Sequence, residues 1–183
     1  MYKYQKAQVA FEVACAFKLI TGEKIMRTVR GEIEFTSNKL DVTDPCYDAS
    51  VWCRTQVDVT PGKYVYMIKI RQERNYEVVA SLRIRLKNAK GGVRFLREIG
   101  AIGVDAGLAG FFENKPDYDD ENWKSVCEEL LKAGNPTILQ TAKESVFGCN
   151  GIVVSSGYGD GAYPVYEIVG ENQTRLGYRI DFV

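Results

Sequence analysis

The sequence predicts an α+β fold in which a mainly antiparallel β-sheet is combined with one principal helix and an N-terminal β-hairpin. Two observations carry this prediction. Apolar and polar residues alternate with a period of two in several segments, as is typical of strands with one buried face. A single segment, at about residues 120–133, combines a helical period with start and stop signals.

The first 38 residues are expected to form a hairpin that extends from a core of residues 39–183. Residues 8–20 alternate, and a polar turn at residues 21–24 leads into a second alternating run at residues 25–35. Alanines in the first run suit a helix equally well, so a helix stays open there. A chain of 183 residues is expected to form one domain.

A second hairpin is predicted between residues 63 and 87. Its two alternating runs, residues 63–71 and 78–87, are separated by a polar turn. Ile and Leu residues fill one side of this hairpin, and basic residues occupy the other side. We call these basic residues the basic ribbon: Lys69, Arg71, Arg83, Arg85 and Lys87.

The helix at residues 120–133 has consistent boundaries. Asp117, Asp119 and Asp120 can cap its first turn, and Gly134 with Pro136 can end it. Its apolar residues repeat on one face, which predicts that four side chains are buried against the sheet: Trp123, Val126, Leu130 and Leu131. The last third of the chain returns to strands, with a Gly-rich hairpin turn at residues 157–161.

Charge is segregated along a chain whose formal net charge is zero. Residues 63–97 hold ten basic and two acidic residues, whereas residues 98–183 hold six basic and fourteen acidic residues. An excess of positive charge on one hairpin is typical of phosphate contact. Two other interpretations stay open: the ribbon can be an ordinary solvated strand face, or the acidic last third can fold over it.

Several classes of chemistry are excluded by composition. The chain has no histidine, so Ser-His-Asp, Cys-His and His-ligated metal sites cannot form. Its five cysteines are irregularly spaced and are interpreted as reduced thiols. We therefore assign no catalytic residue, metal site or cofactor, and an enzyme is the less expected outcome.

Three Asp-bearing stretches stand out, at residues 41–48, 103–110 and 155–164. Asp and Gly are common turn residues, so turns and close packing are the first interpretation. The alternative is that Asp44, Asp105 and Asp160 converge on a divalent cation, because carboxylate oxygens suit magnesium and calcium.

The same stretches resemble a known family. Thr43-Asp-Pro-Cys-Tyr47, Gly103-Val-Asp-Ala-Gly107 and Ser155-Ser-Gly-Tyr-Gly-Asp-Gly161 are similar to motifs of the bacterial and phage domain-of-unknown-function family four-two-four-one. The resemblance covers about residues 41–183 and implies one folded domain of bacterial or mobile-element origin. Asp44, Asp105, Asp160 and Tyr163 are the candidate residues that match its motifs, and the family supplies no catalytic role for them.

The predicted function is a non-catalytic binding protein of phage or mobile-element type that inhibits a host defence system. Its partner would be a host protein or ribonucleoprotein complex such as an RNA-guided nuclease, with anti-CRISPR-like inhibition and RNA contact through the basic ribbon. The alternatives are a small-nucleotide or ligand-binding domain and a carboxylate-metal hydrolase. A cytoplasmic location without membrane contact is expected, because Glu12 and Lys18 interrupt the N-terminal apolar stretch.

Overall fold

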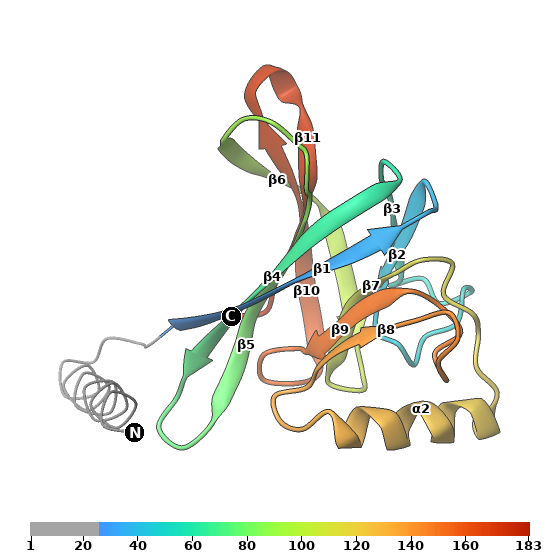
Figure 1. The fold of residues 1–183 in the computed structure, drawn as a ribbon. Coiled ribbons are helices and arrows are strands. Elements are labelled where there is room, and N and C mark those ends of the chain that lie inside the picture. The colour runs from blue at the N-terminus through green and yellow to red at the C-terminus, as the bar shows by residue number, and fades with distance from the viewer. Residues whose placement is uncertain (1–25) are drawn as a thin grey trace, which may run out of the picture.

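The computed structural model describes residues 26–183, which form two antiparallel β-sheets and one long helix (Figure 1). Sheet A has six strands in the order β1 (Met26–Phe35), β4 (Gly62–Gln72), β5 (Glu77–Leu86), β11 (Arg175–Asp181), β10 (Gly161–Gly170) and β6 (Val93–Val104). Sheet B has five strands in the order β3 (Thr55–Asp58), β2 (Lys39–Thr43), β7 (Leu108–Phe112), β9 (Gly151–Ser155) and β8 (Ile138–Thr141). The mainly antiparallel sheet prediction is confirmed.

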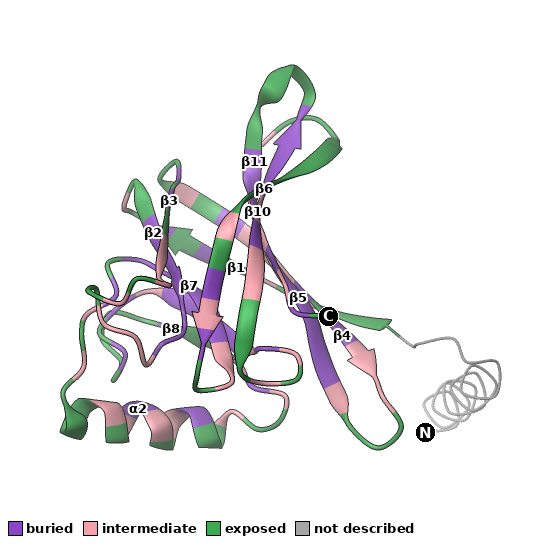
Figure 2. Cartoon of the chain, turned by 180° about the vertical axis from the view of Figure 1, so that it is seen from behind, coloured by how far each residue is buried: buried purple, intermediate pink, exposed green. Residues whose placement is uncertain are grey.

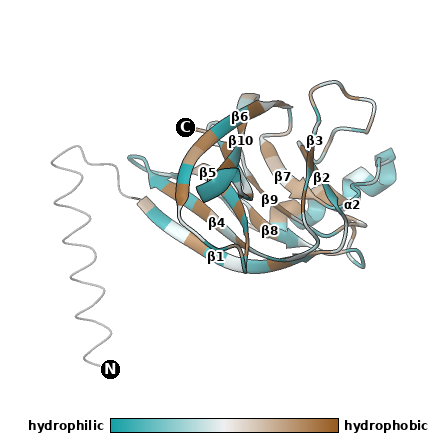
Figure 3. Cartoon of the chain, turned by 90° about the horizontal axis from the view of Figure 1, so that it is seen from above, coloured by the Kyte–Doolittle hydropathy of each residue, from teal (hydrophilic) through white to brown (hydrophobic). Residues whose placement is uncertain are grey.

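The main core lies between the two sheets. Figure 3 shows hydrophobic and hydrophilic residues alternating along β1 and β4, so that each strand turns one row of side chains inward. Sheet A contributes fully buried residues such as Phe35, Ile68 and Leu82, and sheet B contributes Phe111 and Ile152. Burial of both inner faces holds the sheets together.

Strand β1 is an integral part of this core. It pairs with β4 along its whole length, from Met26 opposite Arg71 to Phe35 opposite Gly62, and it buries Ile33 and Phe35. The sequence analysis had placed this strand in an extension outside the core. The expected first strand of that hairpin, residues 8–20, lies outside the described residues.

The predicted hairpin of residues 63–87 is confirmed as β4 and β5. The two strands pair antiparallel, with Ile68 opposite Leu82 on the inner side and Met67 opposite Arg83 on the outer side. The register shifts between Lys69 and Ile70. Strand β2 ends at Thr43, directly before Asp44 and Pro45, a pair that favours a turn.

The predicted helix is confirmed as α2 (Asp120–Lys132), which packs on the outer face of sheet B (Figure 1). The carboxylate of Asp119 caps it by accepting the N–H of Asn122 at 2.8 Å. Val126 and Leu130 are buried against the sheet, but Leu131 is 82% exposed. The expectation that Leu131 is buried was therefore wrong, because it lies about 100° around the helix from Leu130.

Strand β6 and the ends of β10 and β11 extend past sheet B as an arm. Figure 2 shows this end of β6 in the colour of exposed residues, and residues 93–99 are all exposed. The pairing of β6 with β10 shifts register between Val165 and Tyr166 and again between Val169 and Gly170. The sequence analysis did not predict β6.

Among residues 26–183, neither α2 nor the short 3-10 turn at residues 171–173 has the length and apolar character that crossing a membrane requires.

Candidate nucleic-acid interface

The basic ribbon lies on the outer face of sheet A, as its alternation predicts. Lys69 and Arg71 belong to β4, and Arg83 and Arg85 belong to β5. Lys69 is exposed, and the other three are half-buried by their neighbours on the same face. Lys87 follows directly after β5 and is exposed. The core residues of the two strands point to the opposite side of the sheet.

Two arginines from distant parts of the chain join this surface. Arg30 of β1 lies opposite Met67 of β4, and Arg179 of β11 lies opposite Arg83 of β5. Since Met67 is itself opposite Arg83, these four residues form one row across four neighbouring strands. We call the following set the basic face: Arg30, Lys69, Arg83, Arg85 and Arg179.

Sequence reasoning missed Arg30 and Arg179 because both lie outside the charge-rich segment. Each of them alternates with inward-facing residues, as Arg179 does between Tyr178 and Ile180. That alternation marks an outward side chain. Which strands become neighbours is set by the sheet order, which no local pattern reveals.

Arg83 lies at the centre of the basic face. Its pKa is lowered from the ordinary value by burial and by the positive charges of Arg85, Arg179 and Arg30. No carboxylate among residues 26–183 forms an ion pair with it. The centre of this face therefore holds a positive charge that the described chain does not neutralise.

The other ribbon residues differ in how far they are satisfied within the chain. Arg71 pairs with Glu73 at 2.7 Å, and Lys87 pairs with Glu32 at 2.7 Å. Arg85 donates to main-chain carbonyl oxygens, at 3.1 Å to Ala89 and at 2.6 Å to Gly91, and it has no carboxylate partner among residues 26–183. Arg71 and Lys87 are thus internally paired, whereas no carboxylate of the described residues pairs with Lys69, Arg83 or Arg85.

The acidic last third of the chain does not cover the basic face. Its one ion pair there, within the described chain, joins Arg179 to the neighbouring Asp181. Tyr158, from the Gly-rich turn, contacts Arg71 at the edge of the ribbon through its hydroxyl group. The last third of the chain therefore leaves the middle of the basic face open to a partner.

The three Asp-bearing stretches meet at one end of the sandwich. The buried carboxylate of Asp44 accepts the N–H groups of Asp105 and Ala106 through Oδ2, at 2.8 and 2.7 Å, and that of Cys46 through Oδ1 at 2.8 Å. These bonds fix the loop at residues 105–107 against the end of β2. Asp44 thus acts as an anchor for main-chain groups.

The Gly-rich turn is fixed to the same loop. The N–H of Ser156 donates to the carbonyl oxygen of Gly107 at 2.9 Å. The hydroxyl group of Tyr163 lies 2.8 Å from the carbonyl oxygen of Ser156 and 2.6 Å from that of Gly159. Gly159 has a φ of 113°, which favours glycine. The predicted hairpin turn was wrong, however, because this segment leads from β9 of sheet B to β10 of sheet A, and these two strands do not pair.

The loops converge, but their carboxylates do not. Asp105 and Asp160 are exposed, while both oxygens of Asp44 already accept N–H donors, whose positive ends would oppose a cation. Within residues 26–183, no three Cys, Asp or Glu residues are grouped closely enough to hold a metal ion. The arrangement of these motifs is that of a structural junction.

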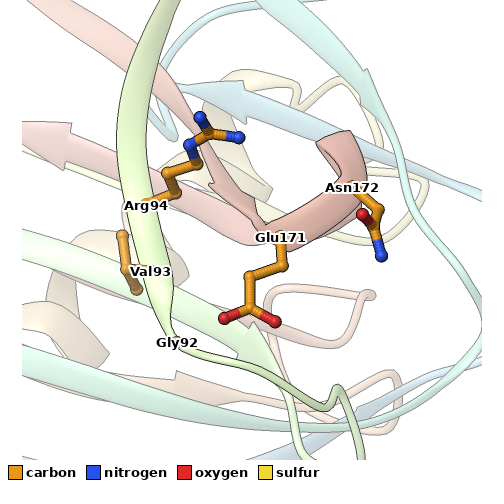
Figure 4. Close-up of a pocket in the computed structure, with 5 residues that line it drawn as sticks. All are labelled: Gly92, Val93, Arg94, Glu171 and Asn172. Atoms are coloured by element: carbon orange, nitrogen blue, oxygen red, sulfur yellow. The ribbon is translucent and has the colours of Figure 1, made fainter.

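Two hollows of the described surface lie away from the basic face. One, of about 590 Å³, lies between α2 and sheet B and is lined mainly by apolar residues, including Leu108, Trp123 and Leu130. The other, of about 470 Å³, lies at the tip of the arm, where the start of β6 faces Glu171 and Asn172 (Figure 4). Neither hollow contains a residue of the basic face.

The comparisons with known proteins add no assignment to this geometry. No protein-family model, no curated protein and no solved structure matches the chain. The resemblance to family four-two-four-one stays a prediction from the motifs.

Proposed function

We propose that this protein is a non-catalytic binding protein that engages the phosphate backbone of RNA through the basic face of sheet A. The observation that carries the proposal is the position of Arg83, which three other arginines surround and no carboxylate of residues 26–183 neutralises. Phosphate groups would supply the missing negative charge.

The loss of folding stability that comes from holding these positive charges close together supports a binding role. Like charges that are held close together on a half-buried surface destabilise the fold, and burial together with the neighbouring arginines lowers the pKa of Arg83. A bound polyanion would convert the repulsion into attraction. The planar guanidinium group is well suited to this, because it donates several hydrogen bonds in a fixed geometry to phosphate oxygens.

An aromatic side chain lies at the margin of the basic face. Tyr166 of β10 lies opposite Arg179 of β11 and is half-buried. A sheet that presents basic and aromatic side chains on one side is a common platform for single-stranded RNA, whose bases can stack on the rings. This combination favours single-stranded RNA over a duplex.

The proposal extends to the cellular target of RNA binding. We propose that the RNA belongs to a host protein–nucleic-acid complex, such as an RNA-guided nuclease, and that binding inhibits it in the host cytoplasm. This step is supported by the resemblance to a family of bacterial and phage proteins and by analogy with small inhibitors of host defence.

The test is a fluorescence-anisotropy titration of a labelled single-stranded RNA at low salt. The double variant Arg83→Glu with Arg85→Glu should lose binding, because it reverses the centre of the basic face. A matched control, Lys124→Glu with Lys143→Glu, makes the same charge change at exposed positions outside sheet A and should bind as the parent does. Absence of RNA binding by the parent, or equal loss in both variants, would refute the proposal.

A further inference from the structure

Among the strands of residues 26–183, none lies beside the outer edge of β6 over half of its length. Strand β6 is an edge strand of sheet A and pairs with β10 on one side. On its other side, the second half is covered, because Thr55 donates to the carbonyl oxygen of Ala101 and Gly103 donates to that of Cys53, both at 3.2 Å. No described residue pairs with the edge of residues 93–99.

This free edge is rich in large apolar residues, which alternate irregularly with three charged ones. Val93, Phe95, Leu96 and Ile99 are large apolar residues with exposed fractions of 37–43%. An unpaired, long and apolar edge is a template for pairing with another strand, and proteins normally protect such edges. The free half of β6 is therefore the place on sheet A where a further strand would bury the most exposed apolar surface.

The other sheet edges of the described chain are protected. Strands β3 and β8 have four residues each, which limits the number of hydrogen bonds an added strand could make. Both β1 and the free half of β6 carry charged residues, but Met26 is the one exposed large apolar residue of β1, whereas residues 93–99 of β6 have four. The contrast with β6 indicates that its exposed edge is used.

We propose that β6 pairs antiparallel with β6 of a second copy of this chain, across a twofold axis at Leu96. This register sets Leu96 opposite the partner's Leu96, and it sets Arg94 opposite the partner's Glu98. The twofold axis repeats the Arg94–Glu98 contact on the other side of Leu96, so one dimer contains two such ion pairs.

The charges at these positions are available for the contact. Arg94 and Glu98 are exposed, and neither forms an ion pair within residues 26–183. Figure 4 shows the guanidinium group of Arg94 and the carboxylate of Glu171 pointing in different directions, although both line the hollow at the tip of the arm. Arg97 is already held by Glu167 on β10.

Neighbouring registers are less favourable. An axis at Arg97 sets this arginine opposite itself, which places like charges together. An axis at Phe95 sets Arg94 opposite the partner's Leu96, so that both charges at Arg94 and Glu98 lack a counterpart. The register centred on Leu96 is the one that combines apolar contact with opposite charges.

The dimer would contain one continuous sheet of twelve strands, because each copy contributes the six strands of sheet A. A twofold axis perpendicular to the sheet keeps both outer faces on the same side. The two basic faces would then look in one direction. The dimer does not depend on RNA binding, and its test uses no RNA.

Disulfide trapping tests the register. In Leu96→Cys the new thiols of two copies lie directly opposite each other, at a Cα separation of about 4.5–5.5 Å, which allows a disulfide. In Val93→Cys the corresponding separation is about 20 Å, since the two positions are six residues apart along the strands. Both variants retain the native cysteines. We expect a covalent dimer on mild oxidation for Leu96→Cys only; equal cross-linking or none in both variants would overturn the proposal.

A charge swap tests the contact itself by sedimentation velocity. Arg94→Glu and Glu98→Arg should each raise the dimer dissociation constant about tenfold, because each replaces two attractions with two repulsions. The double variant restores opposite charges and should dimerise as the parent does. Thermal melts of all variants check folding. A parent that stays monomeric at high concentration, or a double variant as weak as the single ones, would contradict the proposal.

Discussion

The buried carboxylate of Asp44 accepts the N–H of Asp105 at 2.8 Å, and this contact joins two of the three sequence motifs that looked functional. Asp44→Ala should lower the free energy of unfolding by about 3 kcal/mol, because it leaves three main-chain N–H groups near the core without an acceptor. Asp160→Ala, at an exposed position, should change it by less than about 0.5 kcal/mol. Urea denaturation measures both.

The same comparison distinguishes an anchor from a metal site. If Asp44, Asp105 and Asp160 shared a divalent cation, the Asp44 and Asp160 variants would both lose stabilisation by that cation. Thermal shifts of the parent on addition of magnesium or calcium that vanish in both variants would contradict the role of Asp44 as a main-chain anchor.

Glu113 predicts a pH dependence of stability. Burial alone would raise its pKa, but hydrogen bonds outweigh this and lower the pKa below its ordinary value: Thr36 donates through N and Oγ1, at 2.6 and 2.7 Å, and Asn150 donates at 3.0 Å. A lowered pKa in the folded state stabilises the protein above the unfolded-state pKa, and this stabilisation is lost as the pH falls through the folded-state pKa.

The stability of the parent should therefore fall as the pH is lowered below about 5. In Glu113→Gln the part of this fall that is due to Glu113 disappears, so the denaturation midpoints at pH 7 and at acidic pH should lie closer together than in the parent. An unchanged difference between the two midpoints would show that Glu113 is not stabilised in its ionised form.

The packing of α2 is tested by two adjacent leucines. Leu130→Asp should destabilise the protein by about 3 kcal/mol or more, because it places a carboxylate among the residues between α2 and sheet B. Leu131→Asp, at a position that is 82% exposed, should leave the melting temperature nearly unchanged. Equal effects in thermal melts would mean that α2 does not pack on sheet B through Leu130.

Local patterns predicted the elements whose two faces differ strongly. The hairpin of β4 and β5 alternates between core and basic residues, and α2 has a cap, an apolar face and a Gly stop. Strand β6 was missed because its arm is exposed on both faces, so that Phe95 and Leu96 follow each other without alternation. Its fold depends on pairing with β10, which is distant in sequence.

The sequence also predicted only part of the candidate site. Alternation identified the outward row of the hairpin, but it treated all five residues as equivalent. The structure separates Arg71, paired with Glu73, from Arg83, which has no such partner among the described residues, and it adds Arg30 and Arg179 from strands that only the sheet order makes neighbours. Ion pairing and strand order are tertiary features, so a sequence pattern does not contain them.

This separation makes a prediction within the ribbon. Arg83→Ala should weaken RNA binding clearly, because it removes a charge that no carboxylate of residues 26–183 balances from the middle of the basic face. Arg179→Ala should have a smaller effect, since Arg179 pairs with Asp181. Arg71→Ala should have a smaller effect, since the charge of Arg71 is already balanced by Glu73 at 2.7 Å. Anisotropy titrations of the three variants at one salt concentration measure the order of their RNA affinities. A lower affinity for Arg71→Ala than for Arg83→Ala would contradict this prediction.

The most direct test of the account is the salt dependence of RNA affinity. The logarithm of the association constant is plotted against the logarithm of salt concentration for the parent and for Arg83→Glu with Arg85→Glu. We expect a steep negative slope for the parent and a slope smaller in magnitude by about one to two for the variant, because phosphate contacts release counterions. Identical slopes, or affinity for RNA that does not change with salt, would contradict the assignment of the basic face as the RNA-binding surface.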